Sequence, residues 1–347
     1  MDFETVRRLL IEDGYASTYV LQPALEERYE EVFYTVWDYQ RLQGLWAREH
    51  GLKTRDLVEI KLAQIEEFRP DVFYNMSAVY DRGFIGRLGK SARRKDVCWN
   101  AIIEATPRTF KEYDGHVSLH RPFVAYWGER GLPALELQPA IPGAWSALQY
   151  PGKTIEVLFY GQYAPGGLLD NRNRLSERLL RHAQESGSDI RCHLSYTERR
   201  RTLFRIPGIS GWRIPSPIIS FPRRFVREHA LPPLYGRSLY EALAQAKVVI
   251  NAYGDYNRSF KSNMRLFEAV GCGAFLVSEA GDYPDGFEPG VDFLTYRNFD
   301  ELVEQVERIL ADWPVYAEAA ARTQKKIASL YGKERQWNDF LEFAKRL

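Results

Sequence analysis

The sequence predicts an α/β protein made of two Rossmann-like, doubly wound domains. Its 347 residues are enough for two domains of ordinary size. Short apolar runs alternate with amphipathic helical patterns along both halves, which is the rhythm of parallel sheets covered by helices. Proline and glycine gather between residues 139 and 152, a composition typical of a linker. We therefore expect one domain over residues 1–150, a second over 151–331, and a last helix over 332–347.

The first predicted domain opens with a helix over residues 3–12, capped by Asp2, and not with a strand. Residues 31–39 alternate enough between polar and apolar to be a strand. An amphipathic helix is expected over residues 55–67, and Pro70 ends it. The other strands of this domain are expected at residues 71–74, 97–103, 117–119 and 134–137.

The second predicted domain continues the same alternation. Asn298 followed by Glu301 has the pattern of a capping box and marks a helix start. Residues 198–233 carry 8 Arg and many Pro without lasting periodicity, which predicts a long loop or insertion. Strands are expected at residues 155–160, 190–195, 248–251, 274–277 and 293–296. Helices are expected at residues 174–186, 238–246, 264–270, 299–312 and 314–330.

Composition narrows the class of protein. The formal net charge is +1, so no strong overall field attracts nucleic acid, and none is expected as a partner. Cys98, Cys192 and Cys272 are far apart and lie in or beside apolar runs, which predicts buried free thiols in a reducing compartment. No apolar stretch approaches the length of a membrane span, and we expect no signal peptide. The expected location is cytoplasmic.

One stretch, residues 259–279, combines a short helix, a glycine turn and an apolar strand. Ser262 and Asn263 are good N-caps, and Lys261 precedes them. Arg265 and Glu268 are three apart, so they share the helix face opposite the apolar one. Cations beside a helix N-terminus favour an anion, and the carboxylate could accept from hydroxyls of the same ligand. The simpler alternative is an exposed ion pair followed by a glycine C-cap.

This stretch resembles the donor-site core of GT-B glycosyltransferases, in the group-1-like branch that includes CgeB-type proteins. The matching parts are the strand at 248–251, Asn263, Arg265, and the run 267–273. The resemblance covers about residues 155–347 and, more loosely, 55–150. Classical members carry a Glu eight residues before the position of Glu268, where this chain has Phe260.

The resemblance implies two Rossmann-like domains with a cleft between them. The second would hold a nucleotide-sugar donor such as a UDP-sugar, and the first would hold the acceptor. Lys261, Arg265 and the helix N-terminus would then bind the diphosphate, and Glu268 would bind the ribose. The last helix, residues 332–347, would cross back onto the first domain.

Ligands of doubly wound sheets bind at the carboxyl ends of the strands, and this rule adds further candidates. In the second domain it points to Gly161, Gln162 and Asn251, with Arg172 and Arg174 close behind Gly161. The acceptor hydroxyl needs a base, for which Glu104 and His120 stand at strand ends of the first domain. Glu104 could instead simply precede a helix, and His120 could be an ordinary surface residue.

No Asp-x-Asp sequence occurs, so we expect no metal cofactor and assign its role to basic groups and a helix N-terminus. The predicted function is glycosyl transfer to a glycan, lipid, protein or other acceptor. A sugar-nucleotide epimerase and a non-catalytic binding or assembly protein are the alternatives. The arginines of residues 198–233, interleaved with Trp212, Phe221 and Phe225, predict contact with an anionic acceptor or a membrane surface. An ordinary solvated loop is the alternative there.

Overall fold

The structure is a computed structural model. It describes residues 1–78, 83–101, 110–148, 150, 152–164, 169–196, 203–205, 213–215, 222–255 and 259–347, and the statements below concern these. The chain divides into two compact units. Unit 1 is Met1–Gly143 with Ala328–Leu347, and unit 2 is Ala144–Ile327. Each is described by itself.

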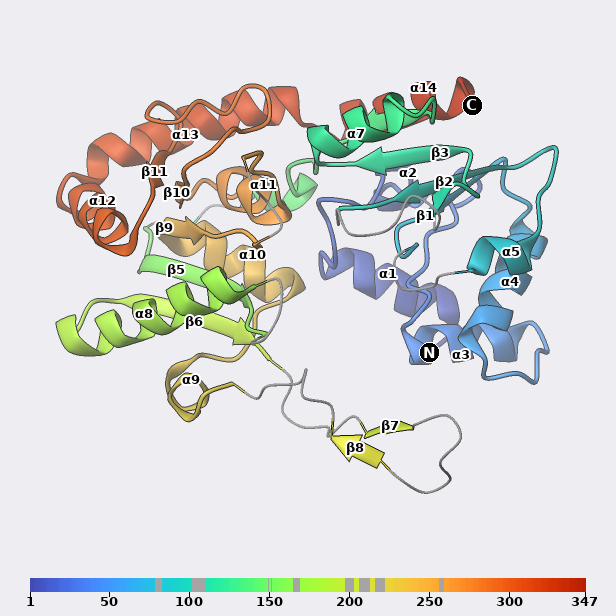
Figure 1. Ribbon diagram of the computed structural model, residues 1–347, viewed down its shortest axis with the longest axis horizontal. Helices are drawn as coiled ribbons and strands as arrows, with labels where there is room; N and C mark the ends of the chain where they lie inside the picture. The colour runs from blue at the N-terminus through green and yellow to red at the C-terminus, as the bar shows by residue number, and fades with distance from the viewer. Residues whose placement is uncertain are drawn as a thin grey trace. The chain divides into compact units, whose positions relative to one another are not determined.

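Unit 1 contains a parallel sheet in which the strands follow chain order, β1-β2-β3-β4. Figure 1 shows α7 and α14 running along one side of this sheet. The strands are β1 (Val72–Asn75), β2 (Lys95–Trp99), β3 (Gly115–Ser118) and β4 (Ala134–Glu136). The described helices are α1 (Phe3–Glu12), α2 (Gln22–Leu25), α3 (Gln40–Glu49), α4 (Leu57–Phe68), α5 (Phe84–Leu88), α7 (Arg121–Gly128) and α14 (Lys333–Lys345).

Local chemistry explains where the helices of unit 1 begin. The Asp2 carboxylate accepts from Thr5 N at 2.7 Å, so the predicted cap of α1 is confirmed. Asp56 caps α4 in the same way. The last helix, α14, buries Phe340 and Phe343 against side chains that come from β2 and β3 of the same unit.

The strand predicted over residues 31–39 is wrong. The structure has turns and extended chain there, and no strand. Phe33 stacks with Phe3 at 5.9 Å and lies 5.5 Å from Phe68, centroid to centroid. Val36 packs against the same cluster, which α1 and α3 form. The apolar residues of this segment therefore pack against helices. Alternation of polar and apolar residues here reflects that packing and not pairing with another strand.

Unit 2 contains a five-stranded parallel sheet in the order β11-β10-β9-β5-β6. Its predicted strands and helices are present, with ends that differ by a few residues. The strands are β5 (Ile155–Gln162), β6 (Ile190–Ser195), β9 (Ala246–Asn251), β10 (Phe275–Glu279) and β11 (Leu294–Tyr296). The helices are α8 (Asp170–Ser186), α9 (Arg224–His229), α10 (Gly236–Gln245), α11 (Met264–Gly271), α12 (Phe299–Ala311) and α13 (Trp313–Leu330), and a 3-10 turn, η1 (Gly143–Ala147), stands at the division between the units.

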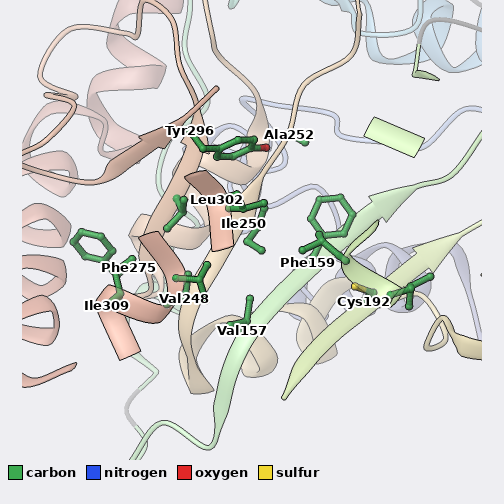
Figure 2. Packing of buried hydrophobic residues seen from close by; sticks show 14 of the residues in the cluster. Val157, Phe159, Cys192, Val248, Ile250, Ala252, Phe275, Tyr296, Leu302 and Ile309 are labelled. Carbon is green, nitrogen blue, oxygen red and sulfur yellow. The ribbon is translucent and has the colours of Figure 1, made fainter. Parts of the chain in front are cut away.

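The core of unit 2 lies between this sheet and the helices that cover it. Val157 and Phe159 of β5 meet Val248 and Ile250 of β9 in one buried cluster (Figure 2). Leu302 and other side chains of α12 close it from the helix side. Each such side chain contributes about 1.5–3 kcal/mol when it leaves water. The three cysteines are buried and free, as predicted.

The predicted loop over residues 198–233 falls largely outside the described residues, including Trp212 and Phe221. Its described parts include a short antiparallel pair, β7 (Leu203–Arg205) with β8 (Arg213–Pro215), and the helix α9. Phe225 of α9 stacks on His229 at 4.3 Å, and the Arg181 guanidinium lies 4.5 Å above its ring. This aromatic therefore packs on α8 of its own unit. In the part of the chain that the structure describes, no helix is long and apolar enough to cross a bilayer.

Candidate functional site

A pocket of about 330 Å³ lies in unit 2 at the carboxyl ends of β5 and β6. Gly161 and Gln162 of β5 line it, so two predicted site residues meet there. Asn263, Arg265 and Glu268 line it from the start of α11. The carboxyl edge of a parallel sheet is where doubly wound folds bind ligands, and the pocket is placed accordingly.

The start of α11 is fixed by its cap. Asn263 has extended backbone, and its Oδ1 accepts from Leu266 N at 3.0 Å, which confirms the predicted N-cap. Every residue from Arg265 to Gly271 is buried. The helix is therefore largely enclosed within unit 2 and meets the pocket with Asn263, Met264, Arg265 and Glu268.

Arg265 is buried, at 7% exposure, so other parts of unit 2 cover the helix face opposite the apolar one. Its Nη1 donates to Asn251 Oδ1 at 3.0 Å and to the Ala252 carbonyl at 3.1 Å. Its Nη2 donates to the Tyr160 carbonyl. These acceptors are all neutral, and no described carboxylate forms an ion pair with this guanidinium. The side chain thus ties α11 to the ends of β5 and β9 and leaves a positive charge at the pocket wall.

Gly161 allows the guanidinium to come this close. A Cβ added at Gly161 would stand 2.7 Å from Arg265 Nη2, closer than side-chain carbons are found. Its φ of +155° is also a conformation that other residues rarely adopt. Gly161, predicted from its place at a strand end, therefore makes room for a buried side chain of its own unit.

Glu268 is buried as well, at 3% exposure. The Tyr160 hydroxyl donates to its Oε2 at 2.6 Å. Burial raises the pKa of Glu268, while the Tyr160 hydrogen bond and the nearby Arg265 charge partly offset this. Glu268 and Arg265 form no ion pair with each other, so the alternative of an exposed pair is also wrong. Tyr160 was not a sequence candidate, although its position near the end of β5 is the available signal.

Two other predicted residues lie behind the pocket wall. Asn251 is fully buried, accepts from Arg265 and from Asn263 Nδ2 at 2.9 Å, and does not line the pocket. Lys261 is buried beside Glu279, with its Nζ 3.1 Å from the carboxylate. Its charge is therefore balanced, and the structure does not bring it into the pocket.

Arg174, predicted as a ligand-binding cation, lies exposed on α8 with its guanidinium beside Asn171 and does not line the pocket. The neighbouring Arg172 does, and it donates to the Gln162 carbonyl at 2.7 Å. Of the two arginines that follow Gly161 in the sequence, the structure thus places Arg172 and not Arg174 at the pocket.

Three further lining residues were not predicted. His193 and Ser195 stand on β6, and burial lowers the pKa of His193. Tyr235, just before α10, is 61% exposed, which is unusual for an aromatic ring beside a pocket. The end of β6 was a usable signal for the first two. Tyr235 lies in a segment without helical or strand periodicity, so the sequence offers no signal for it.

The predicted base residues belong to unit 1. Glu104 lies outside the described residues. His120 is buried at the start of α7, its ring centroid is 5.8 Å from that of Phe123, and burial lowers its pKa to about 4. The alternative of an ordinary surface histidine is therefore wrong.

Comparison with known proteins adds a family and a fold. Residues 173–342 match the family model described as glycosyl transferase-like. No curated protein matches the chain. A solved glycosyltransferase from Rickettsia africae has a TM-score of 0.57 at 10% identity, and the match covers 98% of this chain and 94% of that one.

Two other solved structures were determined with UDP. Anabaena HepE matches with a TM-score of 0.54 at 12% identity, over 84% of this chain and 82% of its own. A variant of TarM from S. aureus matches with a TM-score of 0.56 at 9% identity, over 83% of this chain. The chain spans only 59% of that TarM chain and 58% of another TarM structure.

Each unit has a parallel sheet covered by helices, and the likeness to solved glycosyltransferases shows that the fold is GT-B. The predicted resemblance is confirmed. The chain has the fold of GT-B glycosyltransferases, and its residues 173–342 match the family model described as glycosyl transferase-like.

Proposed function

We propose that this chain moves a sugar from a nucleotide diphosphate, most simply UDP, onto a hydroxyl of a glycan, lipid, protein or other acceptor. The observation that carries the proposal is the buried Arg265 guanidinium, whose described hydrogen bonds all go to neutral oxygens beside the pocket. A buried cation without a counter-charge is costly, so the pocket favours an anionic ligand. The UDP complexes of HepE and TarM support a diphosphate as that anion.

The first turn of α11 would hold the phosphates. Asn263 already occupies Leu266 N, and no described residue accepts from the main-chain N–H groups of Met264 and Arg265. Free N–H groups at a helix start bind phosphate oxygens directly. Arg172, at the opposite wall, supplies a second cation. Lys261, balanced by Glu279, would contribute to the fold and not to the phosphates.

Glu268 would hold the ribose. Tyr160 occupies its Oε2 and leaves Oε1 as an acceptor for a hydroxyl. Tyr235 would then offer its exposed ring to the nucleobase, since base-aromatic stacking contributes roughly 1–3 kcal/mol per base. Gln162 and Gly161 complete the pocket between these groups.

The proposed reaction uses no metal ion, because the sequence lacks Asp-x-Asp and two arginines with a helix N-terminus can balance the departing diphosphate. For the base, the buried His120 is a weak proton acceptor at a pKa of about 4. Glu104 stays the other predicted candidate. Contact of residues 198–233 with an anionic surface stays a prediction.

Thermal unfolding in the presence of UDP, GDP, CMP, dTDP and ADP tests the proposal. A ligand at about 100 times its dissociation constant stabilises the folded state by about 2.7 kcal/mol, which is easily measured. Stabilisation by one diphosphate, and transfer of its sugar to an added acceptor, is the expected result. If no diphosphate stabilises the chain, a non-catalytic binding protein is the better description. Conversion of the sugar nucleotide without acceptor would indicate an epimerase.

A further inference from the structure

Unit 1 contains a second and larger pocket, of about 630 Å³, beside the edge strand β1. Every residue from Arg69 to Ser77 lines it, so the pocket runs along the whole strand. We call this pocket the edge slot. Residues 30–35 line its opposite wall. It shares no lining residue with the 330 Å³ pocket of unit 2.

The main chain of β1 points into the edge slot at alternate residues. Lys95 N of β2 donates to the Asp71 carbonyl, and β1 is parallel to β2 with Phe73 opposite Asp96. Main-chain groups alternate sides along a strand, so those of Val72 and Tyr74 point away from β2. Among the described residues, no group is hydrogen-bonded to the N–H or carbonyl of either residue. These are the unpaired groups that an edge strand presents to another chain.

Side chains on both faces of the sheet extend past this edge. Phe68 of α4 lines the edge slot from one face, and Trp337 and Leu341 of α14 line it from the other. Phe33 closes the third side. The two helical layers therefore leave a space between apolar side chains, next to the unpaired main-chain groups of β1.

Charge at the mouth of the edge slot is mainly negative. Glu30, Glu31 and Asp71 are exposed lining residues, and Arg69 is the exposed cation among them. Arg28, outside the lining, pairs with Glu31 at 2.7 Å. Glu30 and Asp71 remain to attract a basic residue.

We propose that the edge slot binds an extended, basic peptide segment of a partner protein, which adds to the sheet as a strand beside β1. A peptide supplies main-chain partners for Val72 and Tyr74, alternate apolar side chains for the walls, and a Lys or Arg for Glu30 and Asp71. A hydrocarbon chain would fill the same walls but leave those main-chain groups without partners, which is unfavourable.

The probes are two labelled peptides that alternate Lys with Val or with Phe, and copies of them with N-methylated amides. The copies keep the side chains but cannot donate main-chain hydrogen bonds. Fluorescence anisotropy with the full-length chain is expected to show binding of a parent peptide, with at least about tenfold weaker binding of its N-methylated copy. The double variant Glu30→Lys with Asp71→Lys should also bind about tenfold or more weakly at low salt.

Glu66→Lys is the matched control, because Glu66 is exposed on α4 and does not line the edge slot. It should bind the parent peptide as wild type does. Equal binding of parent and N-methylated peptides overturns the proposal in favour of an apolar ligand, which displacement by laurate would identify. Absence of binding by both parents, or equal weakening by Glu66→Lys, also overturns it. These readouts do not involve a nucleotide, so failure here leaves the proposed function untouched.

Discussion

The Arg265 guanidinium lies 3.0 Å from the side-chain oxygen of Asn251, and this contact joins the start of α11 to the end of β9. The same oxygen accepts from Asn263 Nδ2 at 2.9 Å. Asn251 therefore positions both the cap of the helix and the cation of the pocket without lining the pocket itself. Because the amide oxygen is neutral, it orients the guanidinium and leaves the positive charge available to a ligand.

Replacing Asn251 by Asp tests this balance of charge. The new carboxylate would pair with Arg265 and remove the net positive charge from the pocket wall. We expect UDP affinity to fall by about tenfold or more while the thermal midpoint stays close to that of wild type. Calorimetric titration and thermal unfolding measure the two effects. Asn338→Asp, an equivalent change at an exposed site on α14, should leave both unchanged. Undiminished UDP binding by Asn251→Asp would remove Arg265 from the donor site.

Arg265→Met should destabilise the fold, in contrast to an exposed cation. It leaves the buried oxygens of Asn251, Ala252 and Tyr160 without their donor, and each such loss costs about 1–3 kcal/mol. Chemical denaturation should show a loss on the order of 3 kcal/mol. Arg178→Met, on the exposed face of α8, is the control and should change stability by less than about 1 kcal/mol. Equal stabilities of Arg265→Met and wild type would contradict a stabilising role for these buried hydrogen bonds.

Glu268→Gln keeps the shape of the side chain and can still accept from Tyr160. It should weaken uridine and UDP alike, by about tenfold, because ribose contacts are common to both. Burial raises the folded-state pKa of Glu268, so its stabilising contribution is complete below the unfolded value of 4.5 and is lost as pH rises through the folded value. Denaturation curves of Glu268→Gln should not show this loss of stability as pH rises above 4.5. A variant that weakens UDP but not uridine would place Glu268 at the phosphates.

Gly161→Ala should disturb the pocket through Arg265. The added carbon would stand 2.7 Å from Nη2 at a backbone φ of +155°, so the guanidinium has to move. We expect a loss of about 1–3 kcal/mol in stability and weaker UDP binding. Gly128→Ala is the matched control, since a carbon there meets no atom within 4 Å and the residue lies in α7. That change should be neutral or stabilising by up to about 1 kcal/mol.

The sequence predicts the elements of this chain better than its side-chain environments. Asn263 as a cap and the strand-helix order of unit 2 follow from local chemistry, which a window of residues contains. Helical periodicity also predicts that Arg265 and Glu268 share the face opposite the apolar one, but it does not show what covers that face. That face meets the ends of β5 and β9, and which elements cover it is a tertiary fact.

The same limit explains the other errors. Residues 31–39 alternate like a strand, yet Phe33 packs between aromatic side chains of α1 and α4 and no neighbouring strand receives the segment. Arg172 and Arg174 are equivalent in the sequence, and only the phase of α8 decides which one reaches the pocket. Glu104 lies outside the described residues, so its role stays a prediction.

His120 makes the stability of the fold depend on pH. Burial lowers its folded-state pKa to about 4 from an ordinary 6.5, so the folded state holds the ring neutral. The stabilising contribution is therefore complete above pH 6.5 and is lost as pH falls through 4. The shift corresponds to a loss on the order of 3 kcal/mol across that window.

His120→Asn cannot take up a proton, so the difference in unfolding free energy between wild type and variant should shrink by this amount on acidification. Denaturant titrations at several pH values measure it, with His182→Asn as the control because His182 lies on α8 and is only partly buried. If His120→Asn and wild type lose stability in parallel between pH 6.5 and 4, the buried neutral imidazole is not the group responsible.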